Sequence, residues 1–547
     1  MISLSDMKNK SNASIVLLGG ISAILLSLPF LIPHLGWVSL FALVPLLWAE
    51  KLANDSGMKH FWLVHYGCFL IFNALTTWWV CNATVGGGIF ASVANAFQMS
   101  VVFALFRLCR RRFRGSIPYI FLFCAWIAWE RMYFDAQISW PWLVLGNAFA
   151  RSLKWIQWYE YTGTLGGSLW IWLCNLAIFG CSVCIRERSW QNWNLKARLA
   201  APAGLLLLFI FPPAFSLHLW KAPMDEGPEA EVFIAQPNID PYHKFEYLSQ
   251  SEQTDILCGQ IREGIAAHGG KGPLLILAPE TFTNDVFLMD GRLGSVTVER
   301  LNSEIRGCED VSLIVGASSY EYISSKTKPS PTARRLRDGM WVESHNSALL
   351  LDGKSEPQIY HKSKLVVAVE MTPYPKLFCK IDDMLGGVMG RCIGQKERGL
   401  LYAPYDSAKI AVAPVICYES IYGEYCCDYV RKGAQMLAII TNDAWWKDTA
   451  GYRQHLSYAS LRAIETRRWI ARCGNTGISA FIDSKGRIVA RSNWWQKETL
   501  DGSVRLCGRE TFFVKYGDMT GRSCTLLFLL LGAALLVRLV TERKKRN

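Results

Sequence analysis

Residues 412–420 read VAPVICYES. The run 412–416 is apolar and rich in β-branched side chains, which is typical of a buried strand. A cysteine, a tyrosine and a glutamate follow that run at once. Because functional groups of α/β proteins gather where strands end, Cys417 is a candidate for a role beyond packing.

A similar pattern extends through residues 221–521, where short apolar runs alternate with polar, helix-forming stretches. Helices are predicted over 249–267 and 452–470, and the polar stretch 322–340, with two prolines, is predicted as a mobile loop. Mixed strands and helices indicate an α/β domain with layered sheets. The predicted strands are EVFIAQPN (231–238), PLLILAPE (273–280), VSLIVGASS (311–319), SALLLDG (347–353), QIYHK (358–362), IAVAPVICYE (410–419), QMLAIITND (435–443) and ISAFIDSKGRIV (478–489).

The rest of the chain is strongly apolar. Of its 547 residues 51% are hydrophobic and only 19% are charged, and the mean hydropathy is positive. This composition indicates a membrane protein with a large water-facing part. Each apolar segment is near the length of about 20 residues that crosses a bilayer as a helix. Seven spans are predicted in the first half, at 13–32, 36–51, 61–80, 86–106, 117–131, 162–185 and 199–219, and an eighth at 523–540.

The net charge of +13 is concentrated beside these spans. Cytoplasmic loops of membrane proteins are enriched in lysine and arginine, so the basic clusters are predicted to lie inside and both termini in the cytoplasm. No module that stacks aromatic and basic side chains on bases is present, so nucleic acid is not expected as a partner. The clusters are Arg107, Arg110, Arg111, Arg112 and Arg114 after one span, and Arg543, Lys544, Lys545 and Arg546 after the last.

This topology predicts three parts. Residues 1–220 form a membrane domain of seven spans, 221–521 an outer catalytic domain, and 522–547 the last span with a basic tail. The first span follows Lys8 and Lys10, as in a signal peptide, but its apolar stretch is long and further spans follow. A retained anchor is therefore predicted.

The cysteine and histidine patterns predict no metal site. The 17 cysteines form no matched CxxC pairs, and the nine histidines form no HExxH motif. No cofactor is expected either. The sequence leaves open whether cysteines of the outer domain form disulfides; these are Cys258, Cys308, Cys379, Cys392, Cys473 and Cys507.

Three reactive side chains stand at or near the ends of predicted strands: Glu280, Lys362 and Cys417. A thiol of ordinary pKa is only a few per cent thiolate at neutral pH, so a nucleophilic cysteine needs a base and a cation nearby. A glutamate can accept the thiol proton, and a lysine can stabilise the oxyanion of a tetrahedral intermediate. Taken singly, each residue also fits an ordinary structural role.

The local motifs resolve that ambiguity. In their order along the chain, Glu280, Lys362 and Cys417 resemble the Glu-Lys-Cys triad of the nitrilase superfamily, whose fold is an α-β-β-α sandwich. With its apolar first half and last span, nearly the whole chain resembles the bacterial apolipoprotein N-acyltransferase family. The motifs that carry this resemblance are PWLVLGN (141–147), AQPNI (235–239), PET (279–281), YHKSKLV (360–366), CYE (417–419) and TNDAWW (441–446).

The resemblance implies an acyltransferase of the bacterial inner membrane with a periplasmic catalytic domain. A phospholipid would donate an acyl chain, and the amine of the diacylglyceryl-cysteine of an apolipoprotein would accept it. Cys417 would carry the chain as a thioester in a ping-pong reaction. Glu280 would act as base and then acid, and Lys362 would hold the oxyanion, with the backbone N–H of Tyr418 as a second donor.

The resemblance also suggests supporting residues. Glu370, eight residues after Lys362, matches a second glutamate that would orient the ammonium. Tyr418 and Glu419 match the residues after the nucleophile, and Glu419 is expected to hold the turn there. Candidates for contact with lipid are Phe245, Trp445 and Trp446.

Two residues depart from the family pattern, and two further cysteines compete with Cys417. Phe245 stands where the family has tryptophan, and Val369 replaces a glycine before Glu370, which puts the loop around Glu370 in doubt. Cys426 and Cys427 are rival nucleophiles, but neither ends a predicted strand.

Two other functions stay open at this point. A membrane-tethered amidase would use the same triad on small C–N bonds in a water-filled pocket. A transporter or receptor would use the spans, with an inert outer domain, although Glu130 and Arg131 lie only at a span's end.

Overall fold

The chain was analysed as a computed structural model. It describes residues 4–224, 227–242, 244, 247–270, 272–384, 389–406 and 408–544, with side chains from Asn12 onward. These residues form two compact units, one made of Met1–Ala136, Trp140–Ala222 and Tyr516–Asn547, the other of Gln137–Ser139 and Pro223–Lys515. The roles predicted for 1–220, 221–521 and 522–547 stay predictions.

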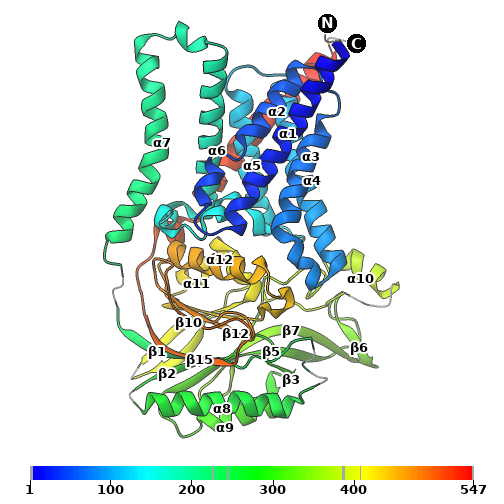
Figure 1. Ribbon diagram of the computed structural model, residues 1–547. Coiled ribbons are helices and arrows are strands. Elements are labelled where there is room, and N and C mark those ends of the chain that lie inside the picture. Colours follow the sequence, from blue (N-terminus) through cyan, green and yellow to red (C-terminus); the bar gives the residue numbers. More distant parts are fainter. Residues whose placement is uncertain are drawn as a thin grey trace. The chain divides into compact units, whose positions relative to one another are not determined.

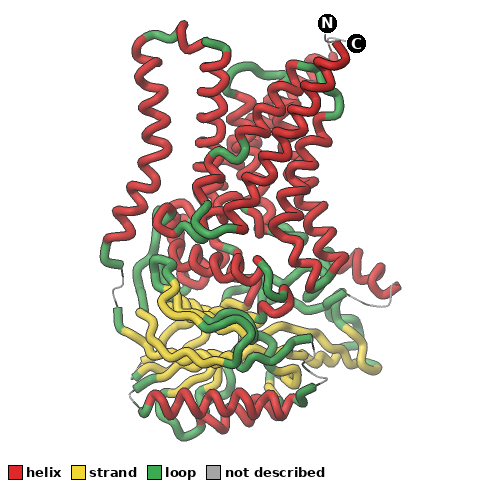
Figure 2. Tube along the Cα trace, in the orientation of Figure 1, coloured by secondary structure: helices red, strands yellow, loops and turns green. Residues whose placement is uncertain are grey.

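The first unit is helical (Figures 1 and 2). Seven of its described helical segments are long and apolar enough to cross a membrane, and they match seven of the eight predicted spans. The segments are Asn12–Leu31 of α1 (Leu4–Leu31), Gly36–Asp55 with α2 (Val44–Asp55), Phe61–Asn82 with α3 (Phe61–Thr77), α4 (Val85–Arg110), α6 (Tyr159–Arg186), α7 (Leu195–Lys221) and α14 (Met519–Lys544).

The predicted span 117–131 is also a helix, α5 (Ile117–Asp135), but it is not among those seven. Glu130, Arg131 and Asp135 in its last turns reduce its hydropathy. The described residues therefore contain seven helices that meet the length and hydropathy requirement, and the eighth span stays a prediction.

Glu130 has a structural role inside this unit. Its side chain is buried, and Oε1 accepts hydrogen bonds from Trp126 Nε1 at 3.0 Å and from the backbone N–H of Leu145 at 2.9 Å. A buried carboxylate is stable only when such donors surround it. The PWLVLGN motif, which contains Leu145, forms two short 3-10 turns, Pro141–Leu143 and Leu145–Phe149, held in this way.

The second unit contains two sheets. The nine-stranded sheet runs β15-β1-β2-β5-β3-β4, with β7 pairing β5, β6 and β8, and the six-stranded sheet runs β14-β13-β12-β11-β10-β9. The first comprises β1 (Glu229–Gln236), β2 (Leu274–Leu277), β3 (Thr283–Met289), β4 (Arg292–Gly294), β5 (Val311–Ser324), β6 (Arg334–Arg337), β7 (Met340–Leu351), β8 (Gln358–His361) and β15 (Glu498–Arg505). The second comprises β9 (Leu401–Tyr405), β10 (Ala408–Ile416), β11 (Met436–Thr441), β12 (Ile470–Gly474), β13 (Ala480–Ile482) and β14 (Ile488–Arg491).

Helices cover the outer faces of the two sheets (Figure 1). α8 (Gln250–His268) and α9 (Val296–Ile305) pack on the first sheet, and α11 (Gly423–Arg431) and α12 (Ala450–Thr466) cover the second. Leu257, Ile261 and Leu301 of these helices pack with buried residues of β1, β2 and β5 in one hydrophobic cluster. The predicted α-β-β-α sandwich is thus confirmed.

The stretch 322–340 corrects the prediction of a mobile loop. Residues 322–324 extend β5, and Arg334–Arg337 form β6, a short strand paired with β7. Four consecutive positions of β6 are exposed, so it has no alternation of buried and exposed residues to mark it as a strand. β6 is ordered because it pairs with β7, although its composition does not indicate a strand.

One close approach inside the first sheet positions the loop after β2. Gly316 on β5 donates its N–H to Pro279 O at 3.0 Å, and its carbonyl accepts the N–H of Phe282 at 2.8 Å. A Cβ at Gly316 would lie 2.5 Å from the Cα of Glu280 and 2.6 Å from the backbone N of Thr281. Only glycine fits here without moving that loop.

Gly316→Ala is therefore expected to destabilise the protein by about 1–3 kcal/mol, because the added methyl meets backbone atoms that cannot rotate away. The measurement is the thermal unfolding midpoint of the purified protein in detergent. Gly259→Ala is the matched control, since nothing lies within 4 Å of that position on α8 and alanine favours a helix by about 1 kcal/mol. Equal midpoints for the two variants would contradict the interpretation.

Candidate active site

The structure brings the three predicted catalytic residues together from three strand ends. Glu280 follows β2, Lys362 follows β8, and Cys417 follows β10 directly. Cys417 opens a 3-10 turn, Cys417–Ile421, with a φ of +49°. A left-handed non-glycine residue is strained by about 1–3 kcal/mol, and such strain is concentrated at functional sites.

Lys362 is the centre of the cluster. Its side chain is 1% exposed, and Nζ donates to Glu280 Oε1 at 3.0 Å and to Glu370 Oε1 at 2.9 Å. Burial disfavours the ammonium, but the charges of Glu280 and Glu370 raise the pKa of Lys362 well above its usual value. The lysine is a permanent cation at physiological pH.

Asn346 on β7 joins the same carboxylates, and the sequence analysis missed it. Its Nδ2 donates to Glu280 Oε1 at 2.8 Å and to Glu370 Oε1 at 2.7 Å. Glu280 Oε2 accepts the backbone N–H of Asn442 at 3.1 Å, and Glu370 Oε2 accepts that of Val366 at 2.7 Å. Both carboxylates are thereby fixed. Asn346 lies just before the predicted strand 347–353, and nothing in the sequence singled it out.

The Cys417 thiol lies within the electrostatic reach of this cluster. Burial, followed by the charge of Glu280, raises the pKa of Cys417 well above its usual value, while Lys362 opposes the rise. The side chain of Thr441 also opposes the rise. The thiol is therefore protonated at rest, and a reaction at sulfur needs a base to accept its proton.

Glu419 ties the cysteine turn to the lysine loop. It is fully buried; Oε2 accepts the backbone N–H of Ile416 at 2.8 Å and Oε1 that of Ser363 at 2.6 Å. The hydroxyl of Tyr360 also donates to Oε1, at 2.8 Å. One carboxylate thus fixes the backbone on both sides of the reacting groups, as expected for a residue that holds the turn.

A second buried network supports the cysteine from behind. His455 Nε2 lies 3.1 Å from the carbonyl O of Cys417, and His455 Nδ1 lies 2.9 Å from Asp443 Oδ1. Arg472 donates to Asp443 Oδ2 at 2.5 Å. All three partners are buried, and Asp443 stands in the TNDAWW motif, whereas nothing in the sequence singled out His455 or Arg472.

The remaining predicted residues lie as follows. Tyr418 is buried, and its hydroxyl donates to Ser139 O at 3.0 Å. Trp445 is 41% exposed, whereas Trp446 packs edge-on against the His455 ring. Phe245 lies outside the described residues. Contact of Trp445, Trp446 or Phe245 with lipid stays a prediction.

Val369, which stands where the family has glycine, is accommodated by a local turn before Glu370. The N–H of Glu370 donates to Val366 O at 2.8 Å, and Ala368 takes the positive φ of 66°. Val369 is 56% exposed. The backbone reverses at Ala368, so valine in place of glycine still leaves Glu370 directed at Lys362.

All 17 cysteines are free thiols. The six outer cysteines whose pairing the sequence left open form no disulfide. Cys426 and Cys427 are fully buried on α11, and burial raises the pKa of Cys426 to about 12. The charged groups that act on these two thiols include Arg462 and Glu465, whereas Glu280 and Lys362 act on Cys417, so the rival nucleophiles are disfavoured.

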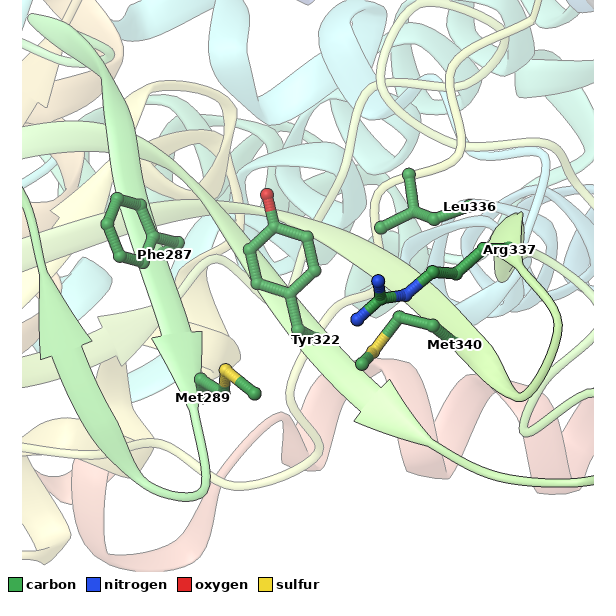
Figure 3. A pocket seen from close by; sticks show the side chains of 6 residues that line it. All are labelled: Phe287, Met289, Tyr322, Leu336, Arg337 and Met340. Carbon is green, nitrogen blue, oxygen red and sulfur yellow. The ribbon is translucent and has the colours of Figure 1, made fainter.

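A separate hollow in this unit holds none of the triad. Its volume is about 460 Å³, and Figure 3 shows Tyr322 of β5 between Phe287 on one side and Leu336 and Arg337 on the other. Its lining is mostly apolar, with Arg337 as the charged member. It lacks a nucleophile and a base, so it is not the catalytic centre.

Comparison with known proteins gives two family matches and several related sequences. Residues 260–509 match the carbon-nitrogen hydrolase family, and residues 22–177 match the apolipoprotein N-acyltransferase N-terminal domain. Apolipoprotein N-acyltransferase of Chlorobaculum tepidum is 28% identical over 94% of this chain and 93% of its own length. That of Geobacter metallireducens is 27% identical over 96% and 95%. The chain belongs to the apolipoprotein N-acyltransferase family.

Among solved structures, that of Saccharomyces cerevisiae Nit3, a member of branch 10 of the nitrilase superfamily, is similar to about half of this chain. It covers 52% of this chain and 92% of that chain, with 13% identity and a TM-score of 0.36.

The raised pKa of Cys417 has a measurable consequence. A thiol of ordinary pKa, about 8.5, is mostly thiolate by pH 9.5, so its alkylation rate levels off there. Because the Cys417 pKa lies well above that value, the rate of carbamidomethylation at Cys417 is expected to keep rising with pH from about 8 to 10. Mass spectrometry of the peptide that contains Cys417, across a pH series, gives the rate.

The matched control is a small-molecule thiol treated in the same detergent, which reports the chemistry of the reagent alone. If the alkylation rate of Cys417 levelled off at a lower pH than that of the free thiol, the pKa of Cys417 would be depressed. That result would overturn the electrostatic account.

Proposed function

We propose that this protein transfers a fatty acyl chain from a phospholipid to the N-terminal amine of the diacylglyceryl-cysteine of an apolipoprotein. The observation that supports it best is the buried Lys362 held between Glu280 and Glu370, with the Cys417 thiol within reach of their charges. Family membership over both halves of the chain gives this cluster its substrate class.

The first half-reaction forms a thioester. Glu280 accepts the proton of Cys417, and the sulfur attacks the ester carbonyl carbon of the phospholipid. The oxyanion of the tetrahedral intermediate lies against the Lys362 ammonium. When the intermediate collapses, the C–O ester bond breaks, and the lysophospholipid oxygen takes the proton that Glu280 holds.

The second half-reaction forms an amide. Glu280, ionised again, accepts a proton from the lipoprotein amine as its nitrogen attacks the thioester carbonyl. The C–S bond breaks, the amide leaves, and the proton on Glu280 returns to sulfur. An amine reacts readily with a thioester, so this step depends chiefly on positioning and on keeping water away.

The other members of the cluster position these groups. Glu370 and Asn346 fix Lys362 and Glu280 through 2.7–2.9 Å contacts. Glu419 fixes the backbone on either side of Cys417 and Lys362, and Tyr418 offers its backbone N–H as a second oxyanion donor. Phe245, Trp445 and Trp446 are proposed to contact lipid, because aromatic side chains favour the membrane interface.

The location follows from charge and hydropathy. Residues 1–220 and 522–547 are proposed to lie in the bacterial inner membrane, and 221–521 in the periplasm, with both termini in the cytoplasm. The cluster Arg107–Arg114 supports this orientation. Six of the seven apolar helices precede residue 221, so the proposal also requires α5 as a span to bring 221–521 to the periplasm. The side chains of Lys8 and Lys10, and the residues Lys545 and Arg546, lie outside the described part of the chain.

The alternatives have less support. An amidase would share the triad, but relatives matched over more than 90% of the chain carry the acyltransferase name. A transporter would be favoured by charged groups free to bind an ion within the spans. Glu130 instead accepts hydrogen bonds from Trp126 and Leu145 within its own unit.

The proposal predicts a covalent intermediate. Purified protein incubated with phospholipid and no lipoprotein should gain the mass of one acyl chain on Cys417, because no amine is present to discharge the thioester. Intact-protein mass spectrometry followed by peptide mapping measures it. Cys417→Ala should show no adduct, and Cys426→Ala should retain it, since the Cys426 thiol faces the backbone carbonyl of Glu419 and not Glu280 or Lys362.

An adduct on Cys417→Ala, or none on the wild type, would contradict the mechanism. Hydrolysis of soluble amides by protein free of phospholipid would favour the amidase. Lipoprotein N-acylation retained in Cys417→Ala cells that lack another source of the activity would favour the non-enzymatic alternative.

The topology is tested separately. Fusions of a periplasm-active reporter after residue 300 should be active, and fusions after residue 112 should be inactive, because positive loops stay in the cytoplasm. A cytoplasm-active reporter at the same two points serves as the control and should give the reverse pattern. Both points on one side would exclude the proposed count of spans.

A further inference from the structure

Three potential metal ligands gather at one end of β5 and β7. Glu321 on β5 lies directly opposite Glu343 in the antiparallel register, and His345 is two residues beyond Glu343 on the same face of β7. One ligand atom from each residue lies within 4.8 Å of the other two. The three side chains are thus close enough to share one small ion.

The facing carboxylates need a cation. Like charges directly opposite each other in an antiparallel pair are destabilising. Among the described residues, no lysine or arginine forms an ion pair with Glu321 or Glu343. Their only charged-pair contact is the one between Glu321 Oε2 and His345 Nε2, at 3.7 Å, beyond hydrogen-bond distance.

The histidine is oriented as a metal ligand would be. His345 is 6% exposed, and its Nδ1 lies 2.9 Å from the carbonyl O of Ile393. A carbonyl can only accept, so Nδ1 carries the hydrogen, and in the neutral ring the lone pair is on Nε2. That buried nitrogen has no hydrogen-bond partner in the structure and faces Glu321. Metal-binding histidines are commonly fixed by such a bond from the second nitrogen.

We propose that Glu321, Glu343 and His345 bind one divalent first-row cation, Zn²⁺ or Mn²⁺. One imidazole and two carboxylates suit such ions. Two ligand atoms about 2.1 Å from a tetrahedral metal lie about 3.4 Å apart, close to the 3.7 Å between Nε2 and Oε2. Glu321 is exposed and Glu343 half-buried, so the ion can enter from solvent and water can complete its coordination.

The site lies beside the catalytic strands. His345 precedes Asn346, which bonds Glu280 and Glu370. The His345 ring also stacks on that of His361 at 4.2 Å, and His361 precedes Lys362. A bound cation would therefore restrain β5, β7 and the start of the lysine loop together, which is expected to raise the thermal stability of the catalytic unit.

Equilibrium dialysis of the full-length protein in detergent against Mn²⁺, after removal of metal by a chelator, tests the proposal. Mn²⁺ is the probe because it favours carboxylate and imidazole over the 17 thiols. Wild type is expected to bind one Mn²⁺ per chain and to unfold at a higher temperature with Mn²⁺ than without it. No acyl donor is present, so the outcome does not depend on the proposed reaction.

Glu343→Gln and His345→Gln should each weaken Mn²⁺ binding at least tenfold and lose the metal-dependent rise in unfolding temperature. Glu343→Gln also removes one of two facing charges, so its metal-free midpoint should equal or exceed that of wild type, which separates lost binding from damage to the fold. The control is Glu231→Gln, an exposed carboxylate on β1 of the same sheet, and it should bind like wild type.

Equal Mn²⁺ binding by wild type and Glu343→Gln would overturn the site. So would a wild type that binds no Mn²⁺ and no Zn²⁺, since the contact between His345 and Glu321 would then be an imidazolium–carboxylate pair alone.

Discussion

The buried ammonium of Lys362 is the constraint on which the active site depends. Removing a charge from water costs several kcal/mol even after relaxation, and only close counter-charges offset that cost. Glu280 and Glu370 supply them at 3.0 and 2.9 Å. Glu280 lies in the loop after β2, whereas Lys362 and Glu370 lie in the loop between β8 and α10, so neither loop can move away without leaving an unpaired charge. The interaction that prepares the chemistry therefore also fixes the fold around it.

Glu419 applies the same principle to the backbone. It bonds Ile416 on the cysteine side and Ser363 on the lysine side, at 2.8 and 2.6 Å. A buried carboxylate that accepts backbone N–H groups fixes strand ends more rigidly than packing does, because each bond has a direction. The positive φ of Cys417 is held from this side, and from the other by His455, whose ring meets the Cys417 carbonyl. The strained backbone conformation of Cys417 is therefore held by contacts from two directions.

The sandwich, and the positions of Glu280, Lys362 and Cys417 near strand ends, could be predicted because both leave local signals. Runs such as 311–319 are short, apolar and rich in β-branched residues, and CYE directly follows such a run. Asn346, His455 and Arg472 left none, because their roles depend on which strands lie side by side. The strand β6 was missed for a similar reason, since Arg334–Arg337 are exposed and gain their order from pairing with β7. A buried arginine such as Arg472 is unusual in a core strand. Its burial is explained only by the ion pair with Asp443, which the sequence does not indicate.

In the proposed reaction, the charge of the cluster explains how a thiol with a raised pKa can still react. With Glu280 and Glu370 ionised and Lys362 protonated, the site carries one net negative charge. Transfer of the thiol proton to Glu280 moves a negative charge from oxygen to sulfur and leaves that total unchanged, so little new charge has to be buried. The oxyanion that follows forms beside the Lys362 ammonium, which the two carboxylates hold in its charged form throughout. After the lysophospholipid departs with the proton, Glu280 is ionised and the net charge is again minus one. The same base is then ready for the incoming amine, and the cluster returns to its starting state without exchanging a proton with water.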